Sequence, residues 1–129
     1  MSDLDLAVLL LVEDEALIRE NLEAELAEAG FKVVCVSNGM EALAKLDADG
    51  GSFRAIVTDI RLGSGPDGWK VARRARELKH EMPIIYMSGD SAHDWPVMGV
   101  PCSIMVSKPF APAQIVTAVA TLLNKVDTL

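Results

Sequence analysis

The feature that most constrains the fold is a series of five short apolar segments that alternate with longer segments of helical periodicity. Each apolar segment has the length of a strand and almost no alternation of apolar and polar residues; the five are 7–12, 32–36, 55–58, 83–87 and 103–106. Continuous runs of Val, Ile and Leu are typical of strands that helices cover on both faces, as in a parallel sheet. We therefore expect five parallel strands at the centre of the protein.

Between these segments, apolar residues recur at the spacing that places them on one face of a helix. The four stripes are Ile18, Leu22, Leu26 and Ala29; Met40, Leu43 and Leu46; Val71, Ala75 and Leu78; and Ile115, Val119 and Leu122. Gly30 follows the first stripe, where a glycine commonly ends a helix, and Pro112 is placed to open the last one. The stripes predict four helices of ordinary length.

The segment 91–102 departs from this pattern. Ser91 and Asp94 have the spacing of a capping box, which predicts the start of a helix. Pro96 removes a main-chain donor and crowds the preceding turn, and Pro101 follows closely. We therefore expect a fourth helix that is short or irregular.

Strands and helices that alternate with short connections predict right-handed crossovers, because a crossover helix packs back onto the sheet only with that hand. The fold class expected is α/β, with an open, doubly wound parallel sheet of five strands. At 129 residues the chain fits a single domain over residues 1–129. We expect no output domain, since the sequence shows no linker, repeat or low-complexity tract.

Charge and composition narrow the function classes. The net charge of -7 and the pI near 4.7 disfavour nucleic acid as a partner, because nucleic-acid binding draws on Lys and Arg. The sequence has neither a signal peptide nor an apolar run of membrane-spanning length, which favours a cytoplasmic protein without a membrane partner. Cys35 and Cys102 stand singly among apolar residues, and we expect both to be reduced, packed thiols.

Chemically active side chains follow four of the five predicted strands. Glu13 and Asp14 end the first strand, Asp59 the third and Ser88 the fourth, and Lys108 follows the fifth. In open α/β sheets the ligand site lies at the carboxyl ends of the strands, where these residues would meet. Three neighbouring carboxylates repel one another unless a cation relieves the charge. Mg²⁺ is the expected cofactor, because it prefers a few carboxylates together with water and phosphate oxygens.

A lysine and a hydroxyl beside an acidic cluster describe a receptor for a transferred phosphoryl group, whose oxygens need donors and cations. Carboxylates can act as nucleophiles and form acyl phosphates. Asp59 is therefore the candidate nucleophile, and Ser88 and Lys108 are the candidate donors to the phosphoryl oxygens.

Five short motifs in this order, LVEDE, VTDIRL, DGW, YMSGDS and SKPF, resemble the signature of the response-regulator receiver family of two-component signalling. The resemblance covers almost the whole chain and points to a stand-alone receiver domain. It implies a flavodoxin-like sheet with strand order 2-1-3-4-5. It also implies that Asp14, Asp59 and the main-chain carbonyl of Arg61 bind Mg²⁺, with Glu13 binding the metal through water.

The same resemblance assigns roles in phosphoryl transfer. It implies that Asp59 accepts the phosphoryl group from a phosphohistidine of a histidine kinase or a histidine phosphotransfer protein. Ser88 would donate a hydrogen bond to the phosphoryl group and Lys108 would form an ion pair with it, next to a Lys108–Pro109 peptide bond that the family usually holds cis. Such a protein catalyses only its own phosphorylation and dephosphorylation, and it signals by binding other proteins.

Three residues bear on how this chain would switch. Met105 stands three residues before Lys108, where the family usually has a Tyr or Phe that moves inward on phosphorylation. Arg61 and Asp90 occupy the two positions that, in the family, tune the attack of water on the acyl phosphate. Our hypothesis is that the bulk and charge of Arg61 shield the phosphoryl group.

Two other functions remain open at this stage. A phosphatase of the haloacid-dehalogenase type would also use an aspartyl nucleophile, but it carries a DxD pair on the first strand, whereas the candidate acceptor here lies on the third. An interaction module that has kept the fold would bind its partner without phosphorylation, and Asp59→Asn would leave that binding unchanged.

Overall fold

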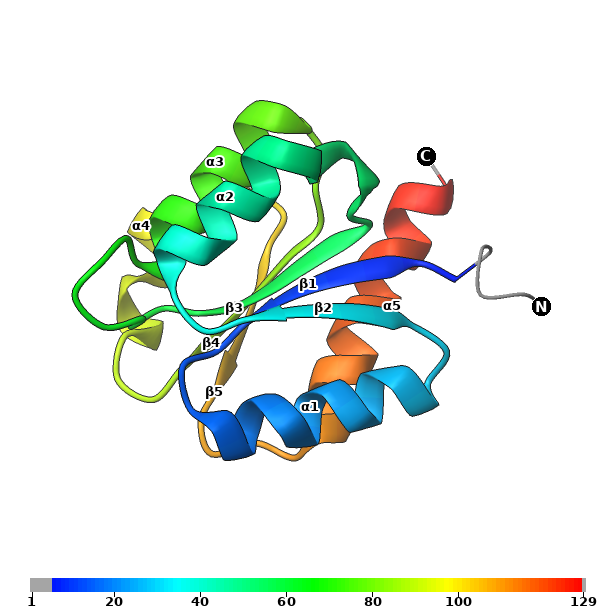
Figure 1. Ribbon diagram of the computed structural model, residues 1–129, viewed down its shortest axis with the longest axis horizontal. Helices are drawn as coiled ribbons and strands as arrows, with labels where there is room; N and C mark the ends of the chain where they lie inside the picture. The colour runs from blue at the N-terminus through cyan, green and yellow to red at the C-terminus, as the bar shows by residue number, and fades with distance from the viewer. Residues whose placement is uncertain (1–5, 129) are drawn as a thin grey trace.

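The computed structural model describes residues 6–128 of the chain, and the side chains of residues 6–125. Residues 1–5 and 129 of the expected single domain lie outside the described residues. The strands are β1 (Val8–Val12), β2 (Lys32–Val36), β3 (Ala55–Asp59), β4 (Ile84–Ser88) and β5 (Ile104–Ser107). They form one parallel sheet in the order β2-β1-β3-β4-β5 (Figure 1). The predicted fold class and strand order are confirmed.

Helices cover both faces of the sheet (Figure 1). Helices α1 (Ala16–Glu28) and α5 (Pro112–Thr128) lie on one face, and α2 (Gly39–Asp49) and α3 (Gly68–Leu78) lie on the other. In β1, Leu10 and Val12 join the core under α2 and α3, whereas Leu9 and Leu11 join the core under α1 and α5. Because successive strand residues point to opposite faces and both faces are covered, the strands show no polar alternation.

The predicted start of α5 and the predicted end of α1 are confirmed. Pro112 is the first residue of α5. After α1, the Phe31 amide donates to the Leu26 carbonyl and the Gly30 amide to the Ala27 carbonyl, which is the hydrogen-bond pattern of a Schellman motif. Gly30 has a φ of 101°, a conformation that side chains disfavour. The glycine therefore ends α1 for the reason that the sequence indicated.

The buried faces of three helices differ in part from the predicted stripes. Ala29 lies exposed after the end of α1, and Leu78, at the end of α3, is 41% exposed. In α2 the predicted Leu46 is buried, but the predicted Met40 is 67% exposed, and Gly39 and Ala42 are buried in its place. Apolar residues occupy more than one face of α2. Ala42 packs in the core under α2 and α3, and the missing side chain of Gly39 lets the main-chain carbonyl of Pro66 approach the helix closely. The stripe of α5 is confirmed.

The segment after β4 contains a 3₁₀ turn, η3 (Ala92–Asp94), and a single helical turn, α4 (Trp95–Met98). The expected short fourth helix is therefore confirmed, and Pro96 is tolerated because it stands in the first turn. The predicted capping box is wrong, since the Ser91 hydroxyl donates to the Asp90 carboxylate, 3.0 Å away, and caps no helix. Among the helices within residues 6–128, none has the length and apolar character needed to cross a bilayer.

The two cysteines differ, although the sequence predicted that both are packed. Both are free thiols. Cys35 on β2 is half-buried against the core under α1 and α5, as expected. Cys102 is exposed, so the prediction was wrong for this residue. It stands in the loop before β5 with a φ of 60°, and that loop turns its side chain outward.

This difference predicts unequal alkylation of the two thiols. Burial, with the charge of Glu23 as a smaller cause, raises the pKa of Cys35 to about 11. Because the thiolate is the nucleophile, iodoacetamide should modify Cys35 about a hundredfold more slowly than a free thiol at mildly alkaline pH. Peptide mapping after a time course should show Cys102 modified first. Equal rates at the two positions would contradict the burial of Cys35.

Candidate functional site

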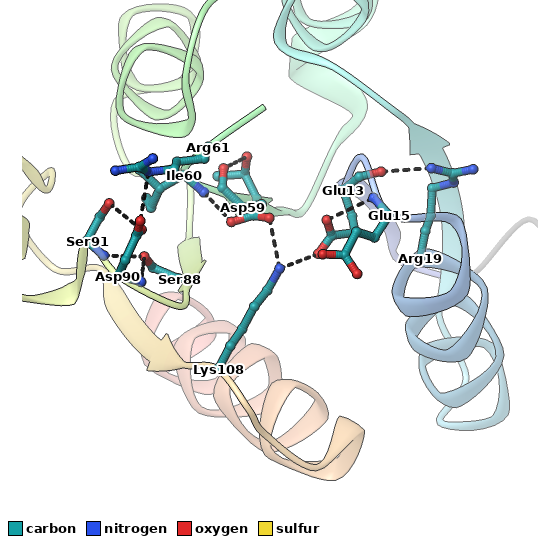
Figure 2. A network of polar contacts seen from close by, with 11 residues as sticks. Glu13, Glu15, Arg19, Asp59, Ile60, Arg61, Ser88, Asp90, Ser91 and Lys108 are labelled. Atoms are coloured by element: carbon teal, nitrogen blue, oxygen red, sulfur yellow. Dashed lines mark hydrogen bonds and ion pairs between the residues drawn. The ribbon is translucent and has the colours of Figure 1, made fainter. Parts of the chain in front are cut away.

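The carboxyl ends of β1, β3 and β5 bring four predicted site residues together. Figure 2 shows three of them, Glu13, Asp59 and Lys108. Glu13, Asp14 and Asp59 each offer a carboxylate oxygen, and these oxygens lie within 4.8 Å of one another. The Lys108 ammonium lies 2.9 Å from Glu13 Oε1 and 2.8 Å from Asp59 Oδ2. The sheet causes this meeting, since β1 and β3 are parallel neighbours and end at the same edge.

Most of the cluster is buried, and burial and the neighbouring charges shift the pKa values of Glu13 and Lys108. Glu13 is fully buried, Asp59 is 7% exposed, and Asp14 is exposed. Burial raises the pKa of Glu13 above its usual range; the hydrogen bond from Lys108 opposes this, and the charge of Asp59 adds to it. Burial disfavours the charged form of Lys108, but its hydrogen bonds to Asp59 and Glu13 prevail and raise its pKa. Lys108 is thus the cation that partly neutralises the cluster.

Main-chain contacts orient two of the carboxylates. Asp59 Oδ1 accepts from the Ile60 amide at 2.8 Å, which leaves Oδ2 facing Lys108. Glu13 Oε2 accepts from the Glu15 amide at 3.2 Å, and Arg19 donates to the Glu13 carbonyl at 2.8 Å. Sequence reasoning assigned no role to Glu15 or Arg19. The Glu15 contact is a main-chain one that any residue there could make, so no signal in the sequence marked it.

The donor set suits a hard divalent cation. All three acidic side chains offer oxygen ligands, and the cluster is open to solvent on the side of the exposed Asp14. Mg²⁺ keeps several waters and takes one or two carboxylates, so an open cluster fits it better than a closed cage would. Arg61 lies two residues beyond Asp59, in the loop that leaves the same strand end. That the main-chain carbonyl of Arg61 binds Mg²⁺ remains a prediction.

A second polar group lies beside the cluster, at the ends of β3 and β4 (Figure 2). The Ser88 hydroxyl is almost fully buried, and its oxygen accepts from the Ser91 amide at 2.7 Å and the Asp90 amide at 3.2 Å. The Asp90 carboxylate forms an ion pair with Arg61, with 3.0 Å between Nε and Oδ2. In this state the oxygen of Ser88 is therefore engaged by the turn after β4.

The two remaining predicted positions are Met105, within β5, and Pro109, just after it. Met105 is half-buried and packs against the core under α2 and α3, opposite Tyr86 of the neighbouring strand. The Lys108–Pro109 peptide bond is cis, as the resemblance implied. Tyr86, which sequence reasoning overlooked, is fully buried, and its hydroxyl accepts from the Val100 amide at 3.1 Å. The aromatic residue paired with Met105 across the sheet is thus Tyr86 of β4.

Gly68 is where the loop after Asp59 returns to the sheet. Its amide donates to the Ile60 carbonyl at 2.8 Å, and a Cβ at this position would clash with the main-chain carbonyl of Asp59. Gly68→Ala should destabilise the protein by about 2 to 3 kcal/mol, because main-chain atoms must shift. Gly51→Ala is the matched control, since no atom lies within 4 Å of the added Cβ. Urea unfolding measures both; equal effects would mean that the contact at Gly68 relaxes freely.

The fold and the cluster together define a doubly wound α/β domain with an acidic, lysine-bearing cluster at the carboxyl edge of its sheet. Residues 9–120 match the family described as the response regulator receiver domain. Because this match covers most of the chain, the protein belongs to the response regulator receiver family. Receiver domains are signalling domains of two-component systems; they bind Mg²⁺ at an acidic pocket and are not classical enzymes.

Individual relatives agree with this assignment. The chain is 33% identical over 122 residues to transcriptional regulatory protein AruR of Pseudomonas aeruginosa, and 35% identical over 121 residues to transcriptional regulatory protein CusR of Escherichia coli. Each alignment covers 91% of this chain but only 49% and 51% of the relatives. The chain therefore spans about half the length of these curated relatives.

Solved structures show the same fold. A response regulator receiver protein from Sinorhizobium medicae is 46% identical, with a TM-score of 0.90 over 95% of this chain and 98% of that chain. A receiver domain protein from Clostridium thermocellum is 21% identical, with a TM-score of 0.84 over 95% of this chain and 98% of that chain. At this lower identity the second similarity shows the fold alone.

Proposed function

We propose that this protein is a phosphorylation switch in a two-component or phosphorelay pathway, with Asp59 as the phosphoacceptor. One observation carries the proposal: Asp59 Oδ2 lies at the open acidic cluster, 2.8 Å from the Lys108 ammonium. An oxygen nucleophile beside a fixed cation is what phosphoryl transfer needs, because the protein contributes positioning and charge stabilisation.

In the proposed reaction one bond to phosphorus forms as another breaks. An Asp59 carboxylate oxygen forms a bond to phosphorus while the bond from phosphorus to the imidazole nitrogen of the donor histidine breaks. The nitrogen keeps the electron pair. Lys108 moves with the charge from the Asp59 carboxylate to the phosphoryl oxygens and holds them by an ion pair.

Mg²⁺ fits the acidic cluster, and Asp14, Asp59 and the Arg61 carbonyl would hold it, with Glu13 binding through water. When bound, the ion neutralises the repulsion between the carboxylates and the incoming phosphoryl oxygens. Glu13 keeps its place in either case, because its carboxylate is fixed by the Glu15 amide and its carbonyl by Arg19.

Signalling would follow from the Ser88 side of the site. A phosphoryl group on Asp59 carries about -1.5 to -2 charge units close to Ser88, in place of the single charge of the carboxylate. Drawing the Ser88 hydroxyl toward this group removes the acceptor of the Asp90 and Ser91 amides, so the segment 88–108 shifts between two arrangements. The proposed output is a new surface for a protein partner, with Met105 and Tyr86 beneath it.

The proposed partners are a histidine kinase or histidine phosphotransfer protein as donor and a downstream protein as target. Nucleic acid is not among them, in keeping with the net charge of -7. In this proposal the chain acts as a single domain in the cytoplasm, where its free thiols stay reduced.

Phosphoramidate tests the proposal, because its phosphorus–nitrogen bond resembles that of phosphohistidine. With Mg²⁺ present, intact-mass spectra should show one added phosphoryl group per chain. The added group should be absent when EDTA replaces Mg²⁺, and hydroxylamine should remove it, as it does from acyl phosphates. A chain that stays unmodified with Mg²⁺ would favour the phosphorylation-independent interaction module. Steady release of phosphate from a generic ester would favour the phosphatase.

A further inference from the structure

A groove lies at the amino edge of the sheet, opposite the edge that carries Asp59. It is formed by the end of α3, the turn before β4, the loop before β5 and the end of α5. Its volume is about 530 Å³, within the range of sites that bind small molecules. Its lining is mostly apolar and includes Pro83, Val100, Pro101 and Leu122. The phosphoacceptor site uses none of these residues.

Hydrogen bonds fix the walls of this groove. Arg76 Nε donates to the Met82 carbonyl at 2.7 Å, and Arg76 Nη2 donates to the Cys102 carbonyl at 3.5 Å. The guanidinium thus joins the end of α3 to the turn before β4 and the loop before β5. In that loop the Val100 amide donates to the buried Tyr86 hydroxyl at 3.1 Å. Because side chains that are already in place lose little freedom on binding, the groove is prepared for a ligand.

The charged residues of the groove favour an anion. Arg76 and Lys125 contribute positive charge, whereas Glu81 is the only acidic residue among the described residues that line it. This balance is the reverse of that of the whole protein, whose net charge is -7. The two hydrogen bonds from Arg76 leave its Nη1 without a partner among the side chains and main chain of residues 6–125. The N–H donors of Nη1 suit the oxygens of an anionic group.

We propose that this groove binds a small organic acid that has an apolar body and a single anionic group. The apolar body lies against Pro83, Val100 and Leu122, and the anionic oxygens accept hydrogen bonds from Arg76. A small polar anion such as inorganic phosphate fits less well, because the apolar lining offers no hydrogen bonds to replace those of its water. The site is separate from the acidic cluster and does not depend on the proposed function of Asp59.

A matched pair of fluorescent probes tests this inference. Anilinonaphthalene sulfonate has an apolar aromatic body with one anionic group, and phenylnaphthylamine has the same body without that group. The anionic probe should bind the wild type at one site, with a dissociation constant on the order of tens of micromolar, as is usual for a ligand of this size. At about ten times that concentration it should slow alkylation of Cys102 by iodoacetamide about tenfold, because Cys102 lines the groove, and leave that of Cys35 unchanged.

Variants of two arginines of α3 separate recognition of the anion from general attraction. Arg76→Met should weaken binding of the anionic probe about tenfold or more, and that of the neutral probe less than about twofold, because it removes the charged donors. Arg73→Met is the matched control on the same helix; Arg73 is exposed and does not line the groove, so both probes should bind as they bind the wild type. Urea unfolding checks that the variants fold. If Arg76→Met does not, Lys125→Met replaces it and should weaken the anionic probe alone, about twofold to fivefold.

Several results would overturn the inference. If the anionic probe does not bind, or binds while the alkylation rate of Cys102 stays the same, the groove is not its site. An equal loss of both probes in Arg76→Met would mean that Arg76 shapes the groove without recognising an anion, and equal effects of Arg76→Met and Arg73→Met would mean general attraction. A dimer in sedimentation that the probe dissociates would show that a second copy of this chain occupies the groove. None of these measurements requires phosphorylation, so a failure of the proposed function would leave them unaffected.

Discussion

Asp59→Asn should abolish formation of the acyl phosphate. The amide has no carboxylate oxygen to attack phosphorus, and Glu13, the other carboxylate in contact with Lys108, is fully buried. With phosphoramidate and Mg²⁺, intact-mass spectra of the variant should show only the unmodified chain at times when the wild type is fully modified. The fold should persist, because Lys108 keeps its contact with Glu13 at 2.9 Å.

Asp49→Asn is the matched control for this experiment. Asp49 is an exposed aspartate at the end of α2, where the helix has returned to the opposite edge of the sheet. The Asp49→Asn variant should be phosphorylated at Asp59 as fast as the wild type. An undiminished phosphoryl group on Asp59→Asn would show that the acceptor is a different residue, and the proposed mechanism would then be wrong.

Lys108→Met should have the largest effect on stability. The substitution keeps most of the apolar length of the side chain but removes the cation that both Glu13 and Asp59 contact. Glu13 is fully buried, so its charge would lose its partner without gaining water. Removing one partner of a buried ion pair is strongly destabilising, and we expect a loss of about 3 kcal/mol in the free energy of unfolding in urea without divalent metal.

Mg²⁺ should partly reverse this loss. A cluster without its lysine is more negative, and it should bind a divalent cation more tightly than the wild-type cluster does. A ligand that binds only the folded state stabilises it, so Mg²⁺ should raise the urea midpoint of Lys108→Met more than that of the wild type. Lys70→Met, on the exposed surface of α3, should match the wild type with and without the metal. If Lys108→Met also behaves like the wild type, the charge of Lys108 does not hold the cluster together.

Local signals predicted the framework well. The apolar runs placed all five strands, because a strand buried on both faces needs apolar residues at every position. Gly30 and Pro112 marked helix ends through main-chain restrictions that act within a few residues. The single turn of α4 followed from Pro96 and Pro101 in the same way. Each of these properties depends on a residue and its immediate neighbours in the chain.

The candidate site was predictable to a similar degree and for a related reason. Parallel strands end at one edge, so residues that follow several strands must approach one another, and the structure places Glu13, Asp14, Asp59 and Lys108 within one cluster. The Asn38 side chain, which the sequence left without a role, accepts from the Glu41 amide and caps α2. Ser88 lies at the expected strand end, but the sequence did not indicate that the next turn engages its hydroxyl.

By itself, the sequence determined the alternation of strands and helices, the carboxyl edge as the place of the charged residues, and the chemistry available there. Only the tertiary structure decided which face of α2 is buried, that Cys102 is exposed, and that Arg61 pairs with Asp90. The first group of properties follows from periodicity and from bonds within a few residues. The second depends on contacts between segments distant in sequence, whose partners are chosen by packing and charge once the sheet has brought the strand ends together.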